Sequence, residues 1–192
     1  MRPRRILIVY GSNHGQTAKI ARYMADLLTA SGDRVTLARV DEFPRRIVPG
    51  RFDGVIVGAS VNFSRHQRSV RRFVRANREM LDTMPTAFFS VSGAAAGADE
   101  ASRAAARGYV DDFLRETGWN PAITDAIAGA MAYTKYPAPT RWMLKRIAQK
   151  SGGPTDTSRD HEFTDWVQVQ LFVEAFAATV PREAEALALA MR

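Results

Sequence analysis

Two kinds of apolar pattern alternate along the chain. Continuous apolar runs are typical of strands buried on both faces of a sheet; they lie at 5–10, 35–40, 54–58, 86–91 and 126–132. Segments with apolar residues at every third or fourth position predict amphipathic helices; they lie at 16–30, 70–81, 101–116 and 166–179. Strands followed by helices in this way predict an α/β protein.

The order of these segments also predicts how the sheet is built. Connections between parallel strands of one sheet are right-handed, so helices cover both of its faces. Five such strands fit a doubly wound parallel sheet of order 2-1-3-4-5, with ligands beyond the carboxyl ends of the first, third and fourth strands. We expect one domain over 1–180, in which 133–163 is an insertion and loop after or within the fifth strand, and a C-terminal extension over 181–192.

The first strand runs into the loop Gly-Ser-Asn-His-Gly-Gln-Thr and then directly into a helix. Backbone N–H groups, the hydroxyls of Ser12 and Thr17, and the positive end of the helix would surround one anion. A triphosphatase loop is excluded because no lysine follows Gly15 at the required position, and the glycine spacing excludes a dinucleotide fingerprint. The loop therefore predicts a phosphate monoester site, although an ordinary strand-to-helix turn uses the same residue types.

The third and fourth strands end in loops of small and hydroxyl-bearing residues, at 58–64 and 90–94. Both would lie beside the phosphate loop, where small residues let backbone amides approach a flavin ring. Phe63 would either stack on that ring or cover the core. We therefore expect FMN to be held by a set of loop residues from the first, third and fourth strands: Ser12, Asn13, His14, Gly15, Gln16, Thr17, Ser60, Val61, Asn62, Phe63, Ser92, Gly93 and Ala94.

The phosphate loop Ser12–Thr17 resembles that of flavodoxins. Further segments are similar to the menaquinone-dependent protoporphyrinogen IX dehydrogenase family, in register from residue 5 to about 180: Gly58–Ser60, Met84–Val91, Ile127–Ala130, Ser151–Thr157 and Thr164–Trp166. The resemblance implies a flavodoxin-like fold and an FMN-dependent oxidoreductase of haem biosynthesis. Such an enzyme takes hydrogen from a porphyrinogen and passes electrons to a quinone at the inner face of the cytoplasmic membrane.

Composition and net charge limit the kinds of partner and chemistry that the chain is expected to have. The formal charge of +7 favours anionic partners. It disfavours an acidic electron-transfer flavodoxin, whereas an NAD(P)H-quinone reductase of the same fold stays open. The absence of cysteine excludes disulfides and thiolate chemistry. With no apolar stretch of about 18 residues, no membrane span is expected, and we expect a cytoplasmic protein. The resemblance implies that it binds peripherally to the inner membrane.

Two basic segments are candidates for substrate or membrane contact. Arg141–Lys150 forms an amphipathic helical pattern, and its Trp142, Lys145 and Arg146 would either meet an anionic bilayer or lie on a plain surface helix. Arginines at helical spacing follow the third strand: Arg68, Arg71, Arg72, Arg75 and Arg78. Arg65 or Arg68 would meet substrate propionates, unless the stripe is only a solvated face. It lacks the interleaved aromatics of a nucleic-acid module, so no nucleic acid is expected.

The three histidines are scattered, without the carboxylate pattern of a metal site, so no metal is expected. His66 follows the third strand and is the candidate proton handler at the flavin rim. No catalytic triad is legible, which fits an enzyme whose chemistry is carried by its cofactor. The sequence leaves open whether the chain forms a homo-oligomer.

Overall fold

The computed structural model describes residues 2–150 and 154–181. Its central strands follow the buried apolar runs of the sequence: β1 (Arg5–Gly11), β2 (Arg34–Arg39), β3 (Gly54–Asn62), β5 (Thr86–Ser92) and β6 (Ile123–Ala128). The main helices follow the segments of helical periodicity: α1 (Gln16–Ala30), α2 (Arg68–Leu81), α3 (Glu100–Thr117) and α5 (Trp166–Thr179). The predicted alternation of strands and helices is confirmed.

The central strands form one parallel sheet of order β2-β1-β3-β5-β6. Counting only these strands, this is the predicted order 2-1-3-4-5. The register sets Gly11 beside Ala59 and Ser60 beside Val91, so β1, β3 and β5 end at one edge of the sheet. The loops expected to hold the cofactor therefore meet there.

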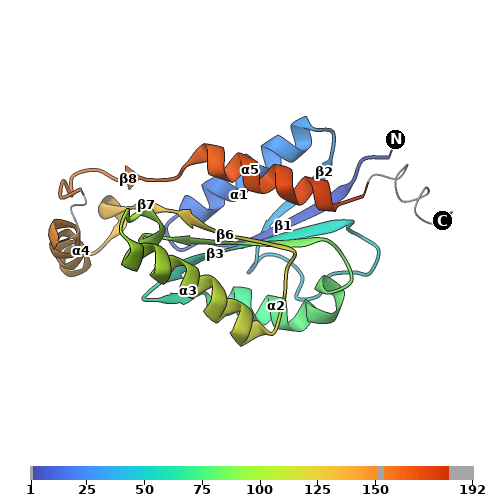
Figure 1. Cartoon of the computed structure of the whole chain (residues 1–192), viewed down its shortest axis with the longest axis horizontal. Helices are drawn as coiled ribbons and strands as arrows, with labels where there is room; N and C mark the ends of the chain where they lie inside the picture. The colour runs from blue at the N-terminus through green and yellow to red at the C-terminus, as the bar shows by residue number, and fades with distance from the viewer. Residues whose placement is uncertain (1, 151–153, 182–192) are drawn as a thin grey trace.

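Helices cover both faces of the sheet, with α1 and α5 on one side and α2 and α3 on the other (Figure 1). The first layer buries Ile20, Met24 and Phe172 against the sheet. The second buries Phe73 and Phe113, and a stacked pair of Phe88 and Phe113 rings joins sheet to helix. Burial on both faces explains why the strands are continuous apolar runs.

Helix ends follow ordinary capping chemistry. Asp165 caps α5, because its carboxylate accepts the N–H groups of Val167 and Gln168. Gly32 follows the end of α1 at φ +88°, as expected of a glycine after a helix.

The third strand extends further than the sequence predicts. It continues to Asn62 and turns back as β4 (Arg65–His66), an antiparallel partner. The two turn residues, Phe63 and Ser64, have φ values of +47° and +60°. Two-residue hairpins need this left-handed backbone but favour Asn-Gly, so the residue types at 63 and 64 do not indicate a hairpin.

The predicted strand 126–132 is wrong in its bounds. β6 starts at Ile123 and ends at Ala128, and after Gly129 the chain leaves the sheet as β7 (Ala130–Met131). β7 pairs with β8 (His161–Glu162) in a separate two-stranded sheet, so the insertion follows the fifth strand of the main sheet.

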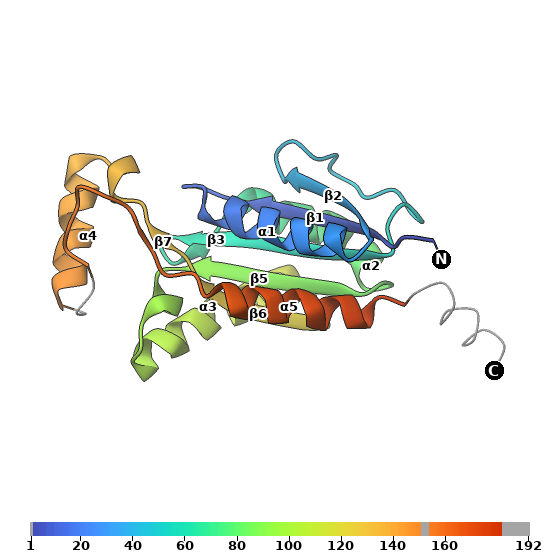
Figure 2. The ribbon, with the colours of Figure 1, turned by 90° about the horizontal axis from the view of Figure 1, so that it is seen from above.

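The insertion itself carries η2 (Tyr133–Lys135) and α4 (Ala138–Lys150), which begins before the predicted Arg141. Figure 2 shows α4 at the end of the molecule opposite the described termini, beyond the carboxyl ends of the strands. The predicted extension 181–192, apart from Pro181, and residues 151–153 of the family motif lie outside the described residues. No helix in the described ranges is long and apolar enough to cross a membrane.

Candidate functional site

A cleft of about 390 Å³ opens at the carboxyl ends of β1, β3 and β5, the edge predicted for the cofactor. It collects most of the expected contacts from three separate loops: Ser12, His14, Gln16, Thr17, Ser60, Val61, Asn62, Phe63, Ser92 and Gly93. Asn13, Gly15 and Ala94 do not line it. Ala94 instead begins a short 3-10 helix, η1 (Ala94–Ala96), beside the cleft.

The loop before α1 is shaped for an anion. Gly15 has φ +101°, a conformation that favours glycine, and it turns the chain into the helix. The Ser12 hydroxyl accepts the Gly15 N–H at 3.0 Å, which leaves its own hydrogen free to donate. Thr17 is 1% exposed, yet its Oγ1 has no hydrogen-bond partner among the described residues.

The unpartnered hydroxyl of Thr17 shows whether the loop suits a flavin phosphate. A buried polar atom without a partner costs free energy, so native sites seldom retain one without a use for it. Thr17 lies in the first turn of α1 and lines the cleft, where a phosphate oxygen would accept its hydrogen together with N–H groups of the helix start. The residues present fit the phosphate of FMN.

Other polar side chains fix the loops to one another. Gln67 donates to Ser60 Oγ and, at 3.2 Å, to Asn13 Oδ1, so the first and third strand ends are joined. Gln16 donates to Thr164 Oγ1 at 2.8 Å, and that hydroxyl donates to the Ala128 carbonyl at 2.7 Å. These bonds hold the cleft walls in place before any ligand arrives.

Phe63 projects from the hairpin turn at the cleft mouth and is 79% exposed. A left-handed backbone costs an ordinary residue about 1–2 kcal/mol, and the turn holds both Phe63 and Ser64 there. The exposed ring excludes the alternative in which Phe63 covers the core. Its position suits stacking against a planar ring.

Residues of the insertion and of α3 complete the cleft, and sequence reasoning missed them. They come from α3, the β6–β7 turn, β7 and the segment around α4: Tyr109, Gly129, Ala130, Met131, Tyr136, Thr140, Met143 and Leu144. Lys135 stands beside them, with its Nζ donating to the carbonyl oxygen of His14 at 2.8 Å. Those that belong to the insertion reach the cleft only because this segment folds back over the loop.

His66 does not reach the flavin rim. Side chains alternate along β4, so Arg65 is exposed and His66 is buried. The ring of His66 packs against Phe88 and Phe113, and its Nε2 lies 2.9 Å from Ser90 Oγ. Burial, with a smaller contribution from Arg71, lowers its pKa to about 4. The structure thus makes His66 a neutral core residue, and the role of proton handler at the cleft is not supported.

His14 lies at the phosphate end of the cleft, with its ring 4.6 Å from that of Tyr136. Burial lowers its pKa, and the nearby Lys135 ammonium lowers it further. Because the ordinary histidine pKa is already about 6.5, His14 is neutral at pH 7. The positive charge at this loop therefore comes from Lys135.

Much of the arginine stripe on α2 is used in packing. Arg71 forms an ion pair with Glu116, and Arg75 donates to the carbonyl oxygen of the same residue, so both fasten α2 to the end of α3. Neither candidate for substrate propionates lines the cleft. Arg65 lines a separate pocket of about 260 Å³ that shares Ser64 and Tyr109 with the cleft, whereas Arg68 lines neither cavity.

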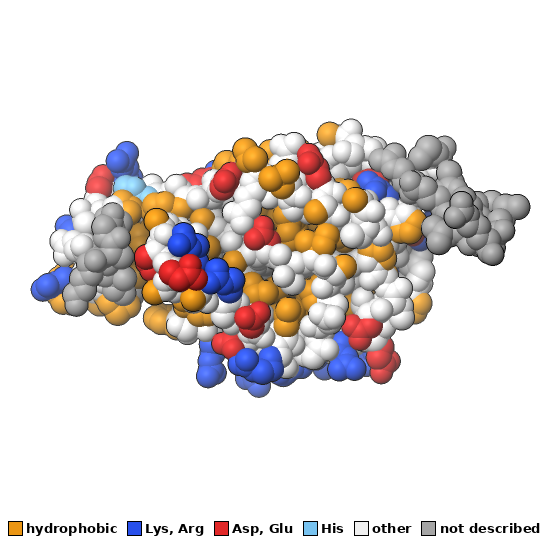
Figure 3. Space-filling view, viewed as in Figure 1, with side chains coloured by type: hydrophobic (Ala, Val, Ile, Leu, Met, Phe, Trp, Pro, Cys, Tyr) orange, Lys and Arg blue, Asp and Glu red, His pale blue; other side chains and the backbone are white. Residues whose placement is uncertain are grey.

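The candidate membrane contacts lie on α4. Trp142 is 62% exposed and Met143 is 42% exposed, and the Arg146 guanidinium lies 5.0 Å from the centre of the Trp142 ring. Lys145 is half-buried on the same helix. Figure 3 shows lysine and arginine side chains around this end and along the lower edge of the molecule.

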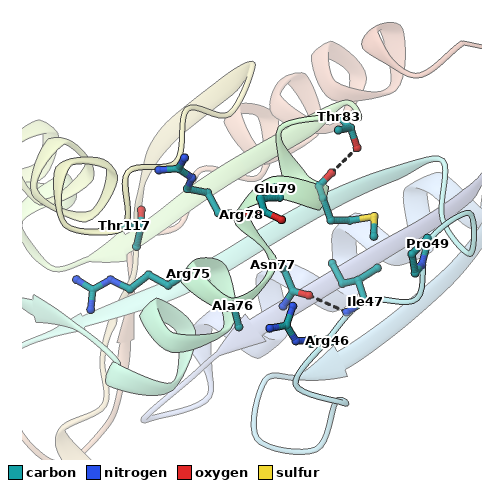
Figure 4. A pocket seen from close by; sticks show the side chains of 11 residues that line it. Arg46, Ile47, Pro49, Arg75, Ala76, Asn77, Arg78, Glu79, Thr83 and Thr117 are labelled. Carbon is teal, nitrogen blue, oxygen red and sulfur yellow. Dashed lines mark hydrogen bonds between the residues drawn. The ribbon is translucent and has the colours of Figure 1, made fainter.

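A cavity larger than the cleft, of about 810 Å³, lies elsewhere (Figure 4). It is lined by the second half of α2 and the β2–β3 loop, near the amino ends of the strands. Asn77 closes its floor, accepting the Ile47 N–H at 2.7 Å and donating to the Arg45 carbonyl oxygen at 2.9 Å. These bonds fix the loop to α2, so we assign the groove a packing role.

Comparison with solved structures agrees with the fold. A short-chain flavodoxin associated with a bacterial microcompartment superposes with a TM-score of 0.56 at 14% identity, over 93% of this chain and 99% of that one. An NADH:FMN oxidoreductase in its apo form gives 0.53 at 13% identity, over 95% and 93%. These similarities show the flavodoxin-like fold.

Sequence comparison reaches further. The model of the flavodoxin domain matches residues 7–158, and with the shape of the loop it identifies the cofactor as FMN. The protoporphyrinogen IX dehydrogenase [quinone] of Escherichia coli strain K12 is 33% identical over 89% of this chain and 93% of that protein. The protein of that name from Leishmania major is 30% identical over 90% of this chain and 74% of that one. The chain therefore belongs to the flavodoxin domain family and, within it, to the quinone-linked protoporphyrinogen IX dehydrogenases.

Proposed function

We propose that this protein oxidises protoporphyrinogen IX, or a closely related porphyrinogen, and passes the electrons through FMN to a quinone, as a step of haem biosynthesis. The names of the relatives support this assignment. The observation that carries it is the composition of the cleft, in which a polar phosphate loop continues into a wall of apolar and aromatic side chains.

That wall includes Phe63, Tyr109, and Met143 and Leu144 of α4. A porphyrinogen has an apolar macrocycle, and a quinone has an apolar ring and tail. Apolar and aromatic walls bind such molecules by excluding water from them. The insertion thus supplies a surface that a carrier of electrons between proteins does not need.

FMN, when bound, supplies the redox chemistry, by accepting a hydride equivalent from the substrate and returning its electrons to the acceptor. The loop Ser12–Thr17 would hold the phosphate, and Phe63 would lie at the ring. No carboxylate lies among the cleft-lining residues within the described ranges, and the lowered pKa of His14 makes its neutral ring a weak proton acceptor. The proton that leaves the substrate with the hydride would therefore pass to water.

The pocket beside the cleft supports a contact with substrate carboxylates. Arg65 is exposed there, in a pocket that Arg115 also lines, together with Asp112 and Glu116. A porphyrinogen in the cleft that extends past Tyr109 would bring its propionates toward Arg65. Arg68 is no longer a candidate for this contact, because it lines neither cavity.

Anaerobic reduction of the FMN-loaded protein tests the proposal. Protoporphyrinogen, coproporphyrinogen and NADPH are mixed with it in turn, and loss of the oxidised flavin absorbance is followed. We expect rapid reduction by a porphyrinogen and slow reduction by NADPH, followed by reoxidation with menaquinone in preference to ubiquinone. Rapid reduction by NADPH alone would instead identify an NAD(P)H-quinone reductase.

We also propose that the end of the molecule carrying α4 docks on the inner face of the cytoplasmic membrane. The exposed Trp142 and Met143 would enter the interface, while Lys145 and Arg146 would meet anionic headgroups. Because the cleft opens beside α4, this orientation would give a quinone in the bilayer a short path to the flavin.

Sedimentation with anionic and neutral vesicles tests the docking. Replacing Trp142 with serine should weaken binding to anionic vesicles severalfold, since the helix is short and binds reversibly. Replacing Val167 with serine is the matched control, because Val167 is 66% exposed on α5, away from α4. Equal binding of both variants, or of neutral and anionic vesicles, would contradict this orientation.

A further inference from the structure

Lys135 lies outside the phosphate loop, yet the insertion brings it to that loop across 121 positions of sequence. Its Nζ donates to the His14 carbonyl oxygen at 2.8 Å. A Cβ built on Gly15 would lie 3.5 Å from the same nitrogen, so the ammonium sits against the backbone at the turn into α1. This is the end of the cleft at which Thr17 presents its unpartnered hydroxyl.

The position of Lys135 is built rather than incidental. Tyr133, two residues earlier, is fully buried, and its hydroxyl donates to the Pro154 carbonyl oxygen at 2.9 Å. Thr134 is bound through its N–H and its hydroxyl to Asp160 Oδ1, at 2.9 and 2.8 Å. Tyr136 packs edge-on against the His14 ring. The turn that carries Lys135 is therefore fixed on both sides.

The charges around the loop leave Lys135 as the cation available to a phosphate. The loop 11–17 contains no lysine or arginine, and His14 is neutral because Lys135 and burial lower its pKa. Lys19, on the next turn of α1, is engaged with Glu162 at 2.6 Å. An ammonium has more donors than the single bond to His14 uses, so Lys135 can keep that carbonyl and also bind a phosphate oxygen.

We propose that Lys135 is a cofactor-specificity residue, which binds the FMN phosphate from the insertion. The proposal rests on FMN being the cofactor and not on the identity of the substrate. Riboflavin has the same ring without the phosphate, so Lys135 would favour FMN over riboflavin. Because Met143 and Leu144 follow in the same insertion, FMN bound at Lys135 would also steady the wall of the substrate cleft.

Flavin titrations of the apoprotein test this proposal through quenching of flavin fluorescence. Lys135→Met keeps the length of the side chain and removes its charge. It should weaken FMN binding about tenfold, because a charge-assisted contact is lost at a partly exposed site, and leave riboflavin binding unchanged within about twofold. Lys135→Arg should restore most of the difference. Arg159→Met, which removes a positive charge elsewhere in the insertion, is the matched control and should bind FMN as the wild type does.

Limited proteolysis gives a second readout that does not depend on catalysis. FMN should protect the segment around α4 in the wild type and protect it less in Lys135→Met, while thermal melting confirms that the variant apoprotein is folded. Equal loss of affinity for FMN and riboflavin would show a merely structural role and overturn the proposal. So would unchanged FMN binding in Lys135→Met. If the wild type did not bind FMN, the assignment of FMN as the cofactor would itself be wrong. The substrate experiments above test the substrate and not this assignment.

Discussion

Replacing Thr17 with valine should affect the FMN-bound and the FMN-free protein differently. The side chain keeps its shape and loses only the hydroxyl. In the structure this hydroxyl is buried without a partner among the described residues. A phosphate in the cleft would supply the missing partner, whereas the FMN-free protein leaves the hydroxyl unsatisfied. The substitution should therefore weaken FMN binding without destabilising the FMN-free protein.

The size of both effects follows from the environment of Thr17. A hydrogen bond to a charged group contributes about 1.5–3 kcal/mol, so the Kd for FMN should rise roughly 10- to 150-fold. An unsatisfied buried hydroxyl costs about 1–3 kcal/mol, so the free energy of unfolding of the apoprotein should stay equal or rise by up to that amount.

Flavin titration and urea unfolding of the apoprotein measure the two quantities. Thr29→Val is the matched control, since the Thr29 hydroxyl lies on the same helix and donates to the Ala25 carbonyl oxygen at 2.7 Å, far from the loop. It should leave FMN binding unchanged. A Thr17→Val protein that binds FMN as tightly as the wild type would refute the reasoning. So would one that loses stability and binds FMN and riboflavin equally poorly.

Three further predictions concern the rest of the fold. Asp33→Ala removes the carboxylate that pairs with Arg4, whose side chain is only 7% exposed. The free energy of unfolding measured in urea should fall by about 3–5 kcal/mol, because a buried charge is left unpaired. A loss below about 1 kcal/mol would contradict this prediction. Ser64→Gly removes the cost of about 1–2 kcal/mol that a left-handed backbone imposes on a residue other than glycine, while the greater backbone entropy of glycine costs up to about 1 kcal/mol. The midpoint of urea unfolding should therefore rise slightly. A fall in the midpoint would contradict the left-handed conformation of Ser64. His66 stays neutral in the native state down to its pKa of about 4, whereas the unfolded chain is protonated below 6.5. Stability should therefore be full above about pH 6.5 and fall by up to about 3 kcal/mol toward pH 4; His66→Gln should show a smaller fall, and an equal fall would exclude this residue as the cause.

The fold was predictable because its strands are buried on both faces. A continuous apolar run such as Ile6–Val9 is typical of a strand covered on both faces of a sheet, and the glycine-rich turn after it predicts the phosphate loop. The hairpin at Phe63 was not predictable, since neither turn residue is one that prefers a left-handed backbone. The position of His66 followed from that hairpin, because strand pairing sends alternate side chains to opposite faces.

The site was predictable only where its residues follow the strands directly. Ser12 and Thr17 lie at the start of a helix, so the chemistry of the loop is legible from local sequence. Lys135 and Leu144 arrive from an insertion whose path depends on contacts such as those of Thr134 with Asp160. No periodicity or spacing in the sequence indicates that this segment folds back over the loop, and so the cation and the apolar wall of the cleft were missed.

The most direct test of the account is turnover of protoporphyrinogen by the FMN-loaded protein without oxygen, followed by the fluorescence of the porphyrin formed. We predict that porphyrin appears only when both FMN and a quinone are present, and that the amount formed rises with the quinone supplied. Porphyrin formation at the same rate in the protein stripped of FMN, or none with FMN and menaquinone together, would contradict the central claim.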